Sequence, residues 1–148
     1  MHKRINMPRF TVSITLIEAV ISRASKCCEY CKSQDRYSPT VFTIDHVLPQ
    51  SVDGTSDFDN LAYAYFLCNR LKSNKLKTFD SATESWVALF SPRKDAWSDH
   101  FAWNEDATQI VPLTIVGRCT AKKLRLNREK LIEYRNCIIP FGTHPPDA

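Results

Sequence analysis

Long apolar runs are absent from this chain of 148 residues. The most apolar stretch near its start, residues 10–21, is interrupted by Thr11, Ser13, Thr15 and Glu18. It therefore falls short of the roughly 20 consecutive apolar residues that cross a membrane. It also lacks the small-residue cleavage site of a signal peptide. We expect a cytoplasmic protein that has no membrane partner.

Glycine is scarce as well, with 3 residues in the chain, and we find neither an internal repeat nor a convincing linker. Apolar residues make up 43% of the sequence, which is typical of a globular protein, and the length suits one domain with its own core. We predict a single domain over residues 11–140. A flexible basic arm would precede it at residues 1–10, and a flexible tail would follow at residues 141–148.

A large excess of one charge is also missing, because the formal net charge is only +4. Basic residues are nevertheless concentrated in one part of the chain: Arg118, Lys122, Lys123, Arg125, Arg128, Lys130 and Arg135. Only Glu129 and Glu133 oppose them there. This run predicts either a positive face that binds phosphates or an ordinary solvated helix face.

Hydrophobic periodicity predicts short helices and strands. Helices are expected at residues 15–24, 115–124 and 128–138 and in a polar segment through residues 69–75. Strands are expected at residues 41–44, 61–67, 86–90, 101–103 and 109–113. The expected helix caps are Thr15, Thr114 and Asn127. This order places Asp45 and His46 where the first strand ends.

The six cysteines indicate metal binding rather than disulfide bonding, because no signal peptide takes the chain to an oxidising compartment. Cys119 and Cys137 fall on the apolar faces of their expected helices, so we predict that both are core residues.

A second group of residues has the chemistry of a hydrolytic metal site. Asp45 and Asn69 supply the few oxygen ligands that Mg²⁺ takes from a protein. His46 has an ordinary pKa of roughly 6.5 and can act as a base near neutral pH. Each of these residues taken alone is ordinary, since an Asn after a loop is often a cap and a lone Asp-His pair is common.

Residues 44–74, IDHVLPQSVDGTSDFDNLAYAYFLCNRLKSN, resemble the HNH nuclease motif. The matching features are Asp45-His46, Pro49, the loop through Gly54, Asn60-Leu61 and Cys68-Asn69-Arg70-Leu71-Lys72. The spacing is similar to that in the HNH domain of RNA-guided CRISPR nucleases. A likeness to stand-alone bacterial HNH proteins continues through residues 90–127, where His100 is expected to be a packed or hydrogen-bonded histidine.

The resemblance implies an α+β fold with a ββα-metal core over residues 27–77, flanked by helices and short strands. It implies one-metal hydrolysis of DNA that leaves 5′-phosphate and 3′-hydroxyl ends. Asp45 and Asn69 would hold Mg²⁺ or Mn²⁺, His46 would be the general base, and Asn60 would hold the loop that carries the base. Arg70 and Lys72 would contact DNA phosphates.

The resemblance also implies a structural zinc held by two Cys-x-x-Cys pairs, but one cysteine is missing. Cys28 and Cys31 form the first pair, whereas the second has Tyr65 in place of a cysteine before Cys68. A phenol with a pKa of about 10 is a poor zinc ligand. Three alternatives follow. Cys27 completes the set, a distant Cys119 or Cys137 completes it, or the zinc is lost and Tyr65 packs in its place.

The missing cysteine leaves a second functional hypothesis open. The chain would then be a nucleic-acid-binding module with a degenerate zinc knuckle and lost or weak nuclease activity. The complete set Asp45, His46, Asn60 and Asn69 favours the endonuclease.

Overall fold

The computed structural model describes residues 12–147, so the arm predicted at residues 1–10 lies outside the described residues. The helices are α1 (Ile14–Arg23), α2 (Phe66–Lys72), α3 (Trp97–His100), α4 (Ile115–Lys123) and α5 (Glu129–Ile138). The strands are β1 (Thr43–His46), β2 (Leu61–Ala64), β3 (Lys77–Asp80), β4 (Ser85–Ala88), β5 (Phe101–Trp103) and β6 (Ile110–Pro112). Single 3₁₀ turns lie at Asp35–Tyr37, Gln50–Val52, Phe58–Asn60 and Ile139–Phe141. None of these helices has the length and apolarity that crossing a membrane requires.

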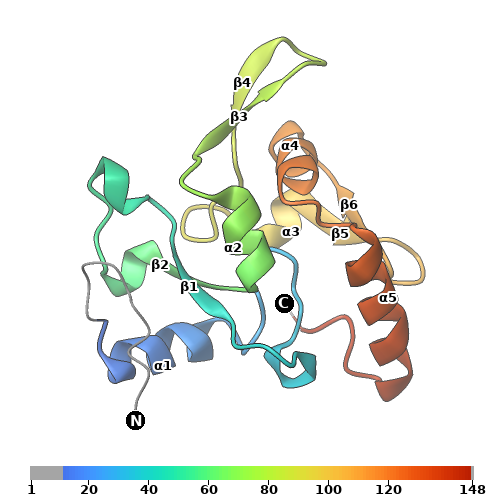
Figure 1. The fold of residues 1–148 in the computed structure, drawn as a ribbon. Coiled ribbons are helices and arrows are strands. Elements are labelled where there is room, and N and C mark those ends of the chain that lie inside the picture. Colours follow the sequence, from blue (N-terminus) through green and yellow to red (C-terminus); the bar gives the residue numbers. More distant parts are fainter. Residues whose placement is uncertain (1–11, 148) are drawn as a thin grey trace.

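The six strands form three antiparallel hairpins, β1–β2, β3–β4 and β5–β6. Helix α2 follows β2 after one intervening residue and contacts β1, which completes a ββα unit. Figure 1 shows the β3–β4 hairpin projecting beyond α2, while α4 and α5 lie toward the opposite side of the molecule from α1. The predicted α+β class with a ββα core is confirmed.

Strand β2 is the centre of the ββα unit, because all four of its residues are buried. Helix α1 packs against it, and Arg23 at the end of α1 donates hydrogen bonds to the carbonyl oxygens of Phe58 and Leu61. These bonds hold the entry to β2 in place. The strand that carries Asp45 and His46 therefore pairs with a partner that the core holds firmly.

One apolar core connects the ββα unit to the C-terminal helices. Its fully buried members come from all parts of the described chain: Val20, Cys28, Tyr30, Leu61, Cys68, Phe101, Ile110, Leu124 and Leu126. Arg135 of α5 is also buried, and its guanidinium donates to the carbonyl oxygens of Thr108 at 3.0 Å and Leu126 at 2.6 Å. These charge-assisted bonds satisfy a cation that would otherwise be costly to bury.

Two of the three predicted helix caps are wrong. Helix α1 begins one residue before Thr15, because Ser13 has an extended backbone and its Oγ accepts from Leu16 N at 3.1 Å. Asn127 does not cap α5. Its side chain instead makes two hydrogen bonds to the backbone of Ile110 in β6, at 2.7 and 2.8 Å. The cap of α4 is confirmed, since Thr114 Oγ1 accepts from the backbone N–H three residues on.

Strand β1 begins and ends two residues later than predicted. Val41 is 85% exposed and lies outside the strand, whereas Asp45 and His46 lie within it, opposite Ala62 and Leu61. Strand β3 was not predicted at all. Its partner β4 and the strands β5 and β6 were predicted, with boundaries that differ by up to two residues.

The flexibility of the segment from residue 141 onward stays a prediction, but its described part contacts the domain. Thr143 accepts from Gln34 Nε2 through its carbonyl at 2.8 Å, and its hydroxyl lies 2.6 Å from the Tyr37 hydroxyl. His144 is buried, lies 2.8 Å from the Ala107 carbonyl oxygen and packs its ring edge on Trp103. These contacts restrain the segment at two residues.

Candidate active site and thiol cluster

The packing of α2 on β1 brings three of the expected site residues together, with Thr43 beside them. Side chains alternate along a strand, so Thr43 and Asp45 share one face of β1. Asn69 and Lys72 are one turn apart and share one face of α2. Asn69 Nδ2 donates to Thr43 Oγ1 at 3.0 Å, and Lys72 Nζ lies 3.1 Å from Asp45 Oδ2. These two contacts fix the helix against the strand.

Asp45 is buried with only 3% exposure and has two partners for its carboxylate. The Tyr30 hydroxyl donates to Oδ2 at 2.5 Å, and Lys72 contacts Oδ1 at 3.3 Å as well as Oδ2. Burial raises the pKa of Asp45 above its usual value, while the Lys72 ammonium and the Tyr30 hydrogen bond act in the opposite direction. The carboxylate is therefore a buried anion that needs a cation beside it.

Lys72 points inward rather than toward solvent. It is 2% exposed, and its ammonium also lies 3.5 Å from the His46 carbonyl oxygen and 3.4 Å from that of Val47. Arg70, the other residue expected to contact phosphate, is exposed. In this arrangement Lys72 acts as the counter-ion of Asp45.

His46 projects from the opposite face of β1, toward the loop that follows the strand. Its Nε2 lies 2.9 Å from Ser56 Oγ and 3.1 Å from Gln50 Nε2. An amide nitrogen can only donate, so Nε2 is an acceptor and Nδ1 carries the proton of the neutral ring. Burial lowers the pKa of His46 below 6.5, Asp45 partly offsets this, and Lys72 lowers it further. The neutral imidazole has a lone pair that can accept a proton.

Asn60 holds the loop between β1 and β2. Its Oδ1 accepts from Leu48 N at 2.8 Å, and its Nδ2 donates to the carbonyl oxygens of Leu48 at 3.0 Å and Thr55 at 2.7 Å. The loop passes so close to itself that a Cβ at Gly54 would lie 1.7 Å from the Leu48 carbonyl oxygen. A larger residue there would displace the loop, and with it Ser56 beside His46.

A second group consists of three thiols on the other side of the ββα unit. The Sγ atoms of Cys28, Cys31 and Cys68 all lie within 4.8 Å of one another, and all three residues are buried. A tetrahedral zinc with Zn–S bonds of about 2.3 Å separates its sulfurs by about 3.8 Å, so the three thiols have the spacing of a metal site. They could hold an ion such as zinc.

The other cysteines do not join this group. Cys27 is buried, but its Sγ lies 3.3 Å from the Ser25 carbonyl oxygen, and only Cys28, Cys31 and Cys68 meet among residues 12–147. Cys119 is buried elsewhere, which confirms its predicted burial, while Cys137 is exposed, so its predicted burial is wrong. Cys137 falls on the solvent side of α5, because Leu131, Arg135 and Ile138 form the buried side.

Tyr65 packs with aromatic rings and a cation. Its ring contacts Phe42 and Phe66, and the Arg128 guanidinium lies over it at 5.6 Å. The same guanidinium approaches Cys68 Sγ at 3.9 and 4.0 Å. Three thiolates around a divalent ion carry a net charge of −1, and Arg128 is placed to balance it.

The three thiols differ in the direction of their pKa shifts. Burial alone would raise the pKa of the Cys31 thiol, but hydrogen bonds from Cys28, Cys68 and Ser33 lower it well below its usual value. Burial raises the pKa of Cys28, and the hydrogen bonds to Cys28 and Cys31 raise that of Cys68. Negative charge is therefore favoured at Cys31, where a cation would be attracted first.

The two residues between Cys28 and Cys31 join the thiol cluster to the rest of the site. Tyr30 donates to Asp45. Glu29 accepts from Tyr63 N in β2 at 2.7 Å and pairs with Arg93. The turn between these two cysteines thus contacts both strands of the hairpin: β1, which carries the acid and the imidazole, through Asp45, and β2 through Tyr63.

These features define the class of the protein: an α+β domain with a ββα unit that presents an acid, an imidazole and an amide. Residues 28–75 match the family model described as HNH endonuclease. The match supports a nuclease or nucleic-acid-binding role and the use of divalent metals. Comparison with curated proteins and with solved structures gave no match.

The sequence reasoning missed several neighbours of the expected residues. The structure adds Tyr30 beside Asp45, Thr43 beside Asn69, Gln50 and Ser56 beside His46, and Arg128 beside Cys68. Only Tyr30 had a signal, since it lies inside the first Cys-x-x-Cys pair. Thr43 lies in β1 itself, Gln50 and Ser56 lie in the segment that follows it, and Arg128 precedes the distant helix α5.

Proposed function

We propose that the protein is a metal-dependent endonuclease that hydrolyses phosphodiester bonds in DNA. The observation that supports this most directly is that Asp45 and His46 project from opposite faces of β1. Asp45 lies on the face that packs on α2, and His46 lies on the other face, beside the loop. A base and an anion that can bind a metal are thereby held on adjacent residues that face opposite sides of the strand.

His46 is the general base in this proposal. In this structure Nε2 faces Gln50 Nε2 and Ser56 Oγ. In the proposal the attacking water replaces these contacts, gives its proton to Nε2 and attacks phosphorus in line with the leaving 3′ oxygen, so that the products carry 5′-phosphate and 3′-hydroxyl ends. Asn60 keeps the loop that carries Gln50 and Ser56 in place. Arg70, exposed on α2, contacts a phosphate of the DNA.

The residues around Asp45 fit a divalent ion such as Mg²⁺ or Mn²⁺. The cation of Lys72 already neutralises the carboxylate, which indicates that positive charge is favoured at this position. Among the described hydrogen bonds of Asn69, the amide nitrogen is engaged by Thr43 and the amide oxygen is not. Asp45 and Asn69 would hold the ion, which stabilises the charge that develops on the phosphate and the leaving oxygen.

We further propose that Cys28, Cys31 and Cys68 hold a structural zinc, with Arg128 balancing the charge of the thiolates. The spacing of the three sulfurs and the low pKa of Cys31 support this. Tyr65 has no place in this ligand set, because its ring packs under Arg128.

A plasmid-cleavage assay tests the nuclease. With Mg²⁺ or Mn²⁺ we expect wild-type protein to nick or cut the DNA, and His46→Ala to lower the rate by roughly 100-fold to 10,000-fold. His100→Ala is the matched control, because this histidine bonds to Thr114 Oγ1 at 2.6 Å outside the site. Wild-type cleavage no faster than that of His46→Ala would refute the proposal.

One observation favours a second candidate function, a nucleic-acid-binding module without effective nuclease activity. Lys72 contacts both carboxylate oxygens of Asp45, and a permanent ion pair there would keep a divalent ion out. In that case the protein would bind DNA in a filter or anisotropy assay, and no divalent metal would produce cleavage.

A further inference from the structure

The β3–β4 hairpin presents two large aromatic side chains to solvent. Phe79 and Trp86 face each other across the hairpin register and are 52% and 64% exposed. Their rings meet edge to face, with centroids 5.7 Å apart at 67°. Because the hairpin projects from the body of the molecule (Figure 1), these rings form a raised apolar surface rather than part of the core.

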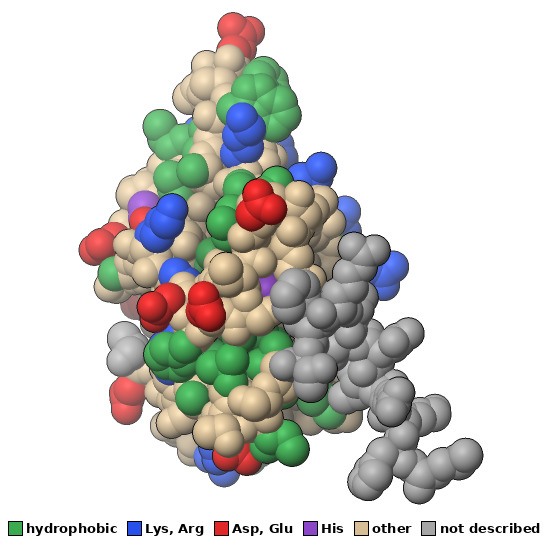
Figure 2. Space-filling view, turned by 90° about the vertical axis from the view of Figure 1, so that its left-hand side faces the viewer, with side chains coloured by type: hydrophobic (Ala, Val, Ile, Leu, Met, Phe, Trp, Pro, Cys, Tyr) green, Lys and Arg blue, Asp and Glu red, His purple; other side chains and the backbone are tan. Residues whose placement is uncertain are grey.

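Positive charge flanks this aromatic surface. Lys77 lies on the same face of β3, with its Nζ 5.5 Å from the centre of the Trp86 ring. Figure 2 shows hydrophobic side chains together with Lys or Arg side chains at the upper, projecting end of the molecule. Exposed aromatic rings beside cations are the combination that binds the bases and phosphates of unpaired nucleic acid.

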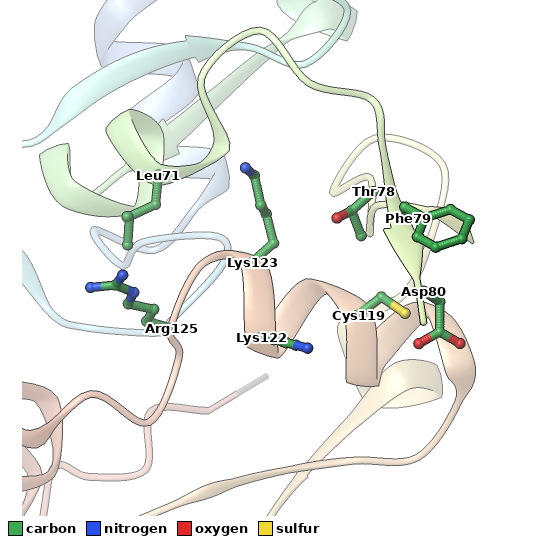
Figure 3. A pocket seen from close by; sticks show the side chains of 8 residues that line it. All are labelled: Leu71, Thr78, Phe79, Asp80, Cys119, Lys122, Lys123 and Arg125. Carbon is green, nitrogen blue, oxygen red and sulfur yellow. The ribbon is translucent and has the colours of Figure 1, made fainter. Parts of the chain in front are cut away.

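The base of the hairpin borders a basic groove. The groove has a volume of about 310 Å³ and runs between α2, β3 and the end of α4. In Figure 3 Lys123 extends into the space between α2 and β3, and Arg125 extends beneath Leu71. Thr78 and Phe79 of β3 both line the groove, so the aromatic pair borders it directly.

The charges of the groove are not balanced from within the described chain. Asp80 is its one acidic lining residue, and Arg118 already pairs with it at 2.9 and 3.2 Å. None of the ion pairs among residues 12–147 uses Lys122, Lys123 or Arg125. Three cations are thus left to attract anions, which is the condition for a phosphate track.

The groove borders the helix of the proposed active site. Leu71 lines it and stands between Arg70 and Lys72 on α2, and four residues separate the end of α2 from the start of β3. A DNA strand bound beside α2 would therefore reach the hairpin within a short distance along its backbone.

We propose that the outer face of the β3–β4 hairpin stacks on unpaired bases of the DNA substrate, while Lys122, Lys123 and Arg125 hold the adjoining phosphates. The protein then prefers DNA with single-stranded bases beside the cleavage position to fully paired duplex. The faces of paired bases are covered by their neighbours, so only unpaired or terminal bases can stack on Phe79 and Trp86. This inference rests on the proposed action on DNA.

A second copy of the chain fits this surface less well. Two hairpins that met about a two-fold axis would bring the lysines of both copies together, and like charges oppose such a contact. A polyanion with flat apolar bases complements both the cations and the rings.

Binding measured without cleavage tests the proposal separately from the nuclease activity. The His46→Ala protein, without divalent metal, is titrated with a labelled duplex, with the same duplex bearing a single-stranded overhang, and with the single strand. We expect tighter binding of the two DNAs that have unpaired bases, with quenching of the fluorescence of exposed Trp86. Phe79→Ala and Trp86→Ala should each weaken that binding by roughly 10-fold and leave duplex affinity within about 2-fold.

Controls separate stacking from charge and from misfolding. Trp86→Phe keeps an aromatic ring and should restore most of the affinity. Phe141→Ala removes an equally exposed ring, at 66%, from the end of the chain, and should have no effect. Replacing Lys122, Lys123 and Arg125 with Ala should weaken binding of all three DNAs and flatten the dependence of log K on log salt by roughly 0.7 to 0.9 per lost contact.

The outcomes divide cleanly. Unchanged affinity for the overhang and single strand in Phe79→Ala and Trp86→Ala would overturn the stacking site. A change of oligomeric state in these variants, with DNA affinities unchanged, would assign the hairpin to a protein contact and would also overturn it. Failure of the nuclease proposal has a separate readout, because wild-type protein would then show no metal-dependent cleavage in the plasmid assay.

Discussion

The thiol cluster and the acid–imidazole site use the same short elements and yet differ in how they are closed. Adjacent residues of α2 serve the two, since Cys68 belongs to the thiol cluster and Asn69 contacts Thr43 of β1. The cluster is sealed, and all three of its thiols are buried. The other site is sealed only on the side of Asp45, because His46 is partly exposed beside a loop.

A structural metal is enclosed by protein ligands, whereas a catalytic metal keeps positions open for water and substrate. The thiol cluster fits the first description, while the proposed metal ligand Asp45 lies on the sealed side of its site and pairs with Lys72. Tyr30 connects the two regions, because it lies between Cys28 and Cys31 and donates to Asp45. The closed region can thus hold the open one in position, and the following experiments break or sharpen that relation.

Cys31→Ser should have the largest effect, because it removes the thiol at which negative charge is most favoured. We expect bound zinc to fall from one equivalent to near zero and the free energy of unfolding to drop by roughly 3 kcal/mol or more. Elemental analysis and urea unfolding measure these changes. Cys27→Ser is the matched control, since its thiol points to Ser25; equal zinc in Cys31→Ser and wild type would contradict the ligand set.

Lys72→Met should be nearly as destabilising in the absence of divalent metal, because it leaves the buried Asp45 carboxylate without a counter-ion. Removing one partner of a buried pair costs about 3–5 kcal/mol. Added Mg²⁺ should then raise the melting temperature of this variant more than that of wild type, because no ammonium competes for Asp45. Arg70→Met, an exposed neighbour, is the control. No extra Mg²⁺ response would argue against metal binding at Asp45.

Tyr30→Phe should separate the two regions with a smaller effect. The ring stays in the core, but Asp45 loses a charge-assisted hydrogen bond, so we expect roughly 10-fold slower cleavage. Zinc content should be unchanged, because the Cys28 and Cys31 thiols remain. A loss of zinc together with activity would mean that Tyr30 supports the knuckle rather than Asp45.

Tyr65→Cys should have the smallest effect and acts in the opposite direction. It adds a thiol three residues before Cys68 and so completes the second Cys-x-x-Cys pair. We expect zinc to leave for a chelator about 10-fold more slowly, with cleavage little changed. Faster zinc loss than in wild type would indicate that the packing of Tyr65 under Arg128 matters more to the cluster than a fourth sulfur.

Much of the site follows from local spacing in the sequence. The segment from Asp45 to Lys72 is short, so the residues of its two strands and helix must meet once the ββα unit forms. The resemblance to the HNH motif implied the ββα unit and the roles of Asp45, His46, Asn60 and Asn69; the class of the fold and the unit are confirmed, and the roles stay predictions. The boundaries of β1 could not be predicted, because the pairing of Asp45 with Ala62 depends on the register of a distant strand.

The orientation of Lys72 is the clearest example of a feature that the spacing of residues in the sequence does not predict. Its position on α2 suggested a phosphate contact, but the helix turns it toward Asp45, where it is 2% exposed. The aromatic hairpin is another, because β3 has no clear alternation and its pairing of Phe79 with Trp86 appears only in the folded chain. Arg128 reaches Cys68 from sixty residues away.

The sequence by itself determined the chemistry of this protein: three thiols, an acid beside an imidazole, and amides at set intervals within one ββα unit. The two strands and the helix of this unit are short, so residue type and spacing decide which side chains reach the site. Only the tertiary structure decided the pKa shifts and the charge partners of these side chains. Burial made Asp45 depend on Lys72 and Tyr30, and hydrogen bonds from neighbouring thiols lowered the pKa of Cys31. Lys72, Tyr30 and Cys68 lie far along the chain from the groups on which they act, so no local pattern encodes their effects.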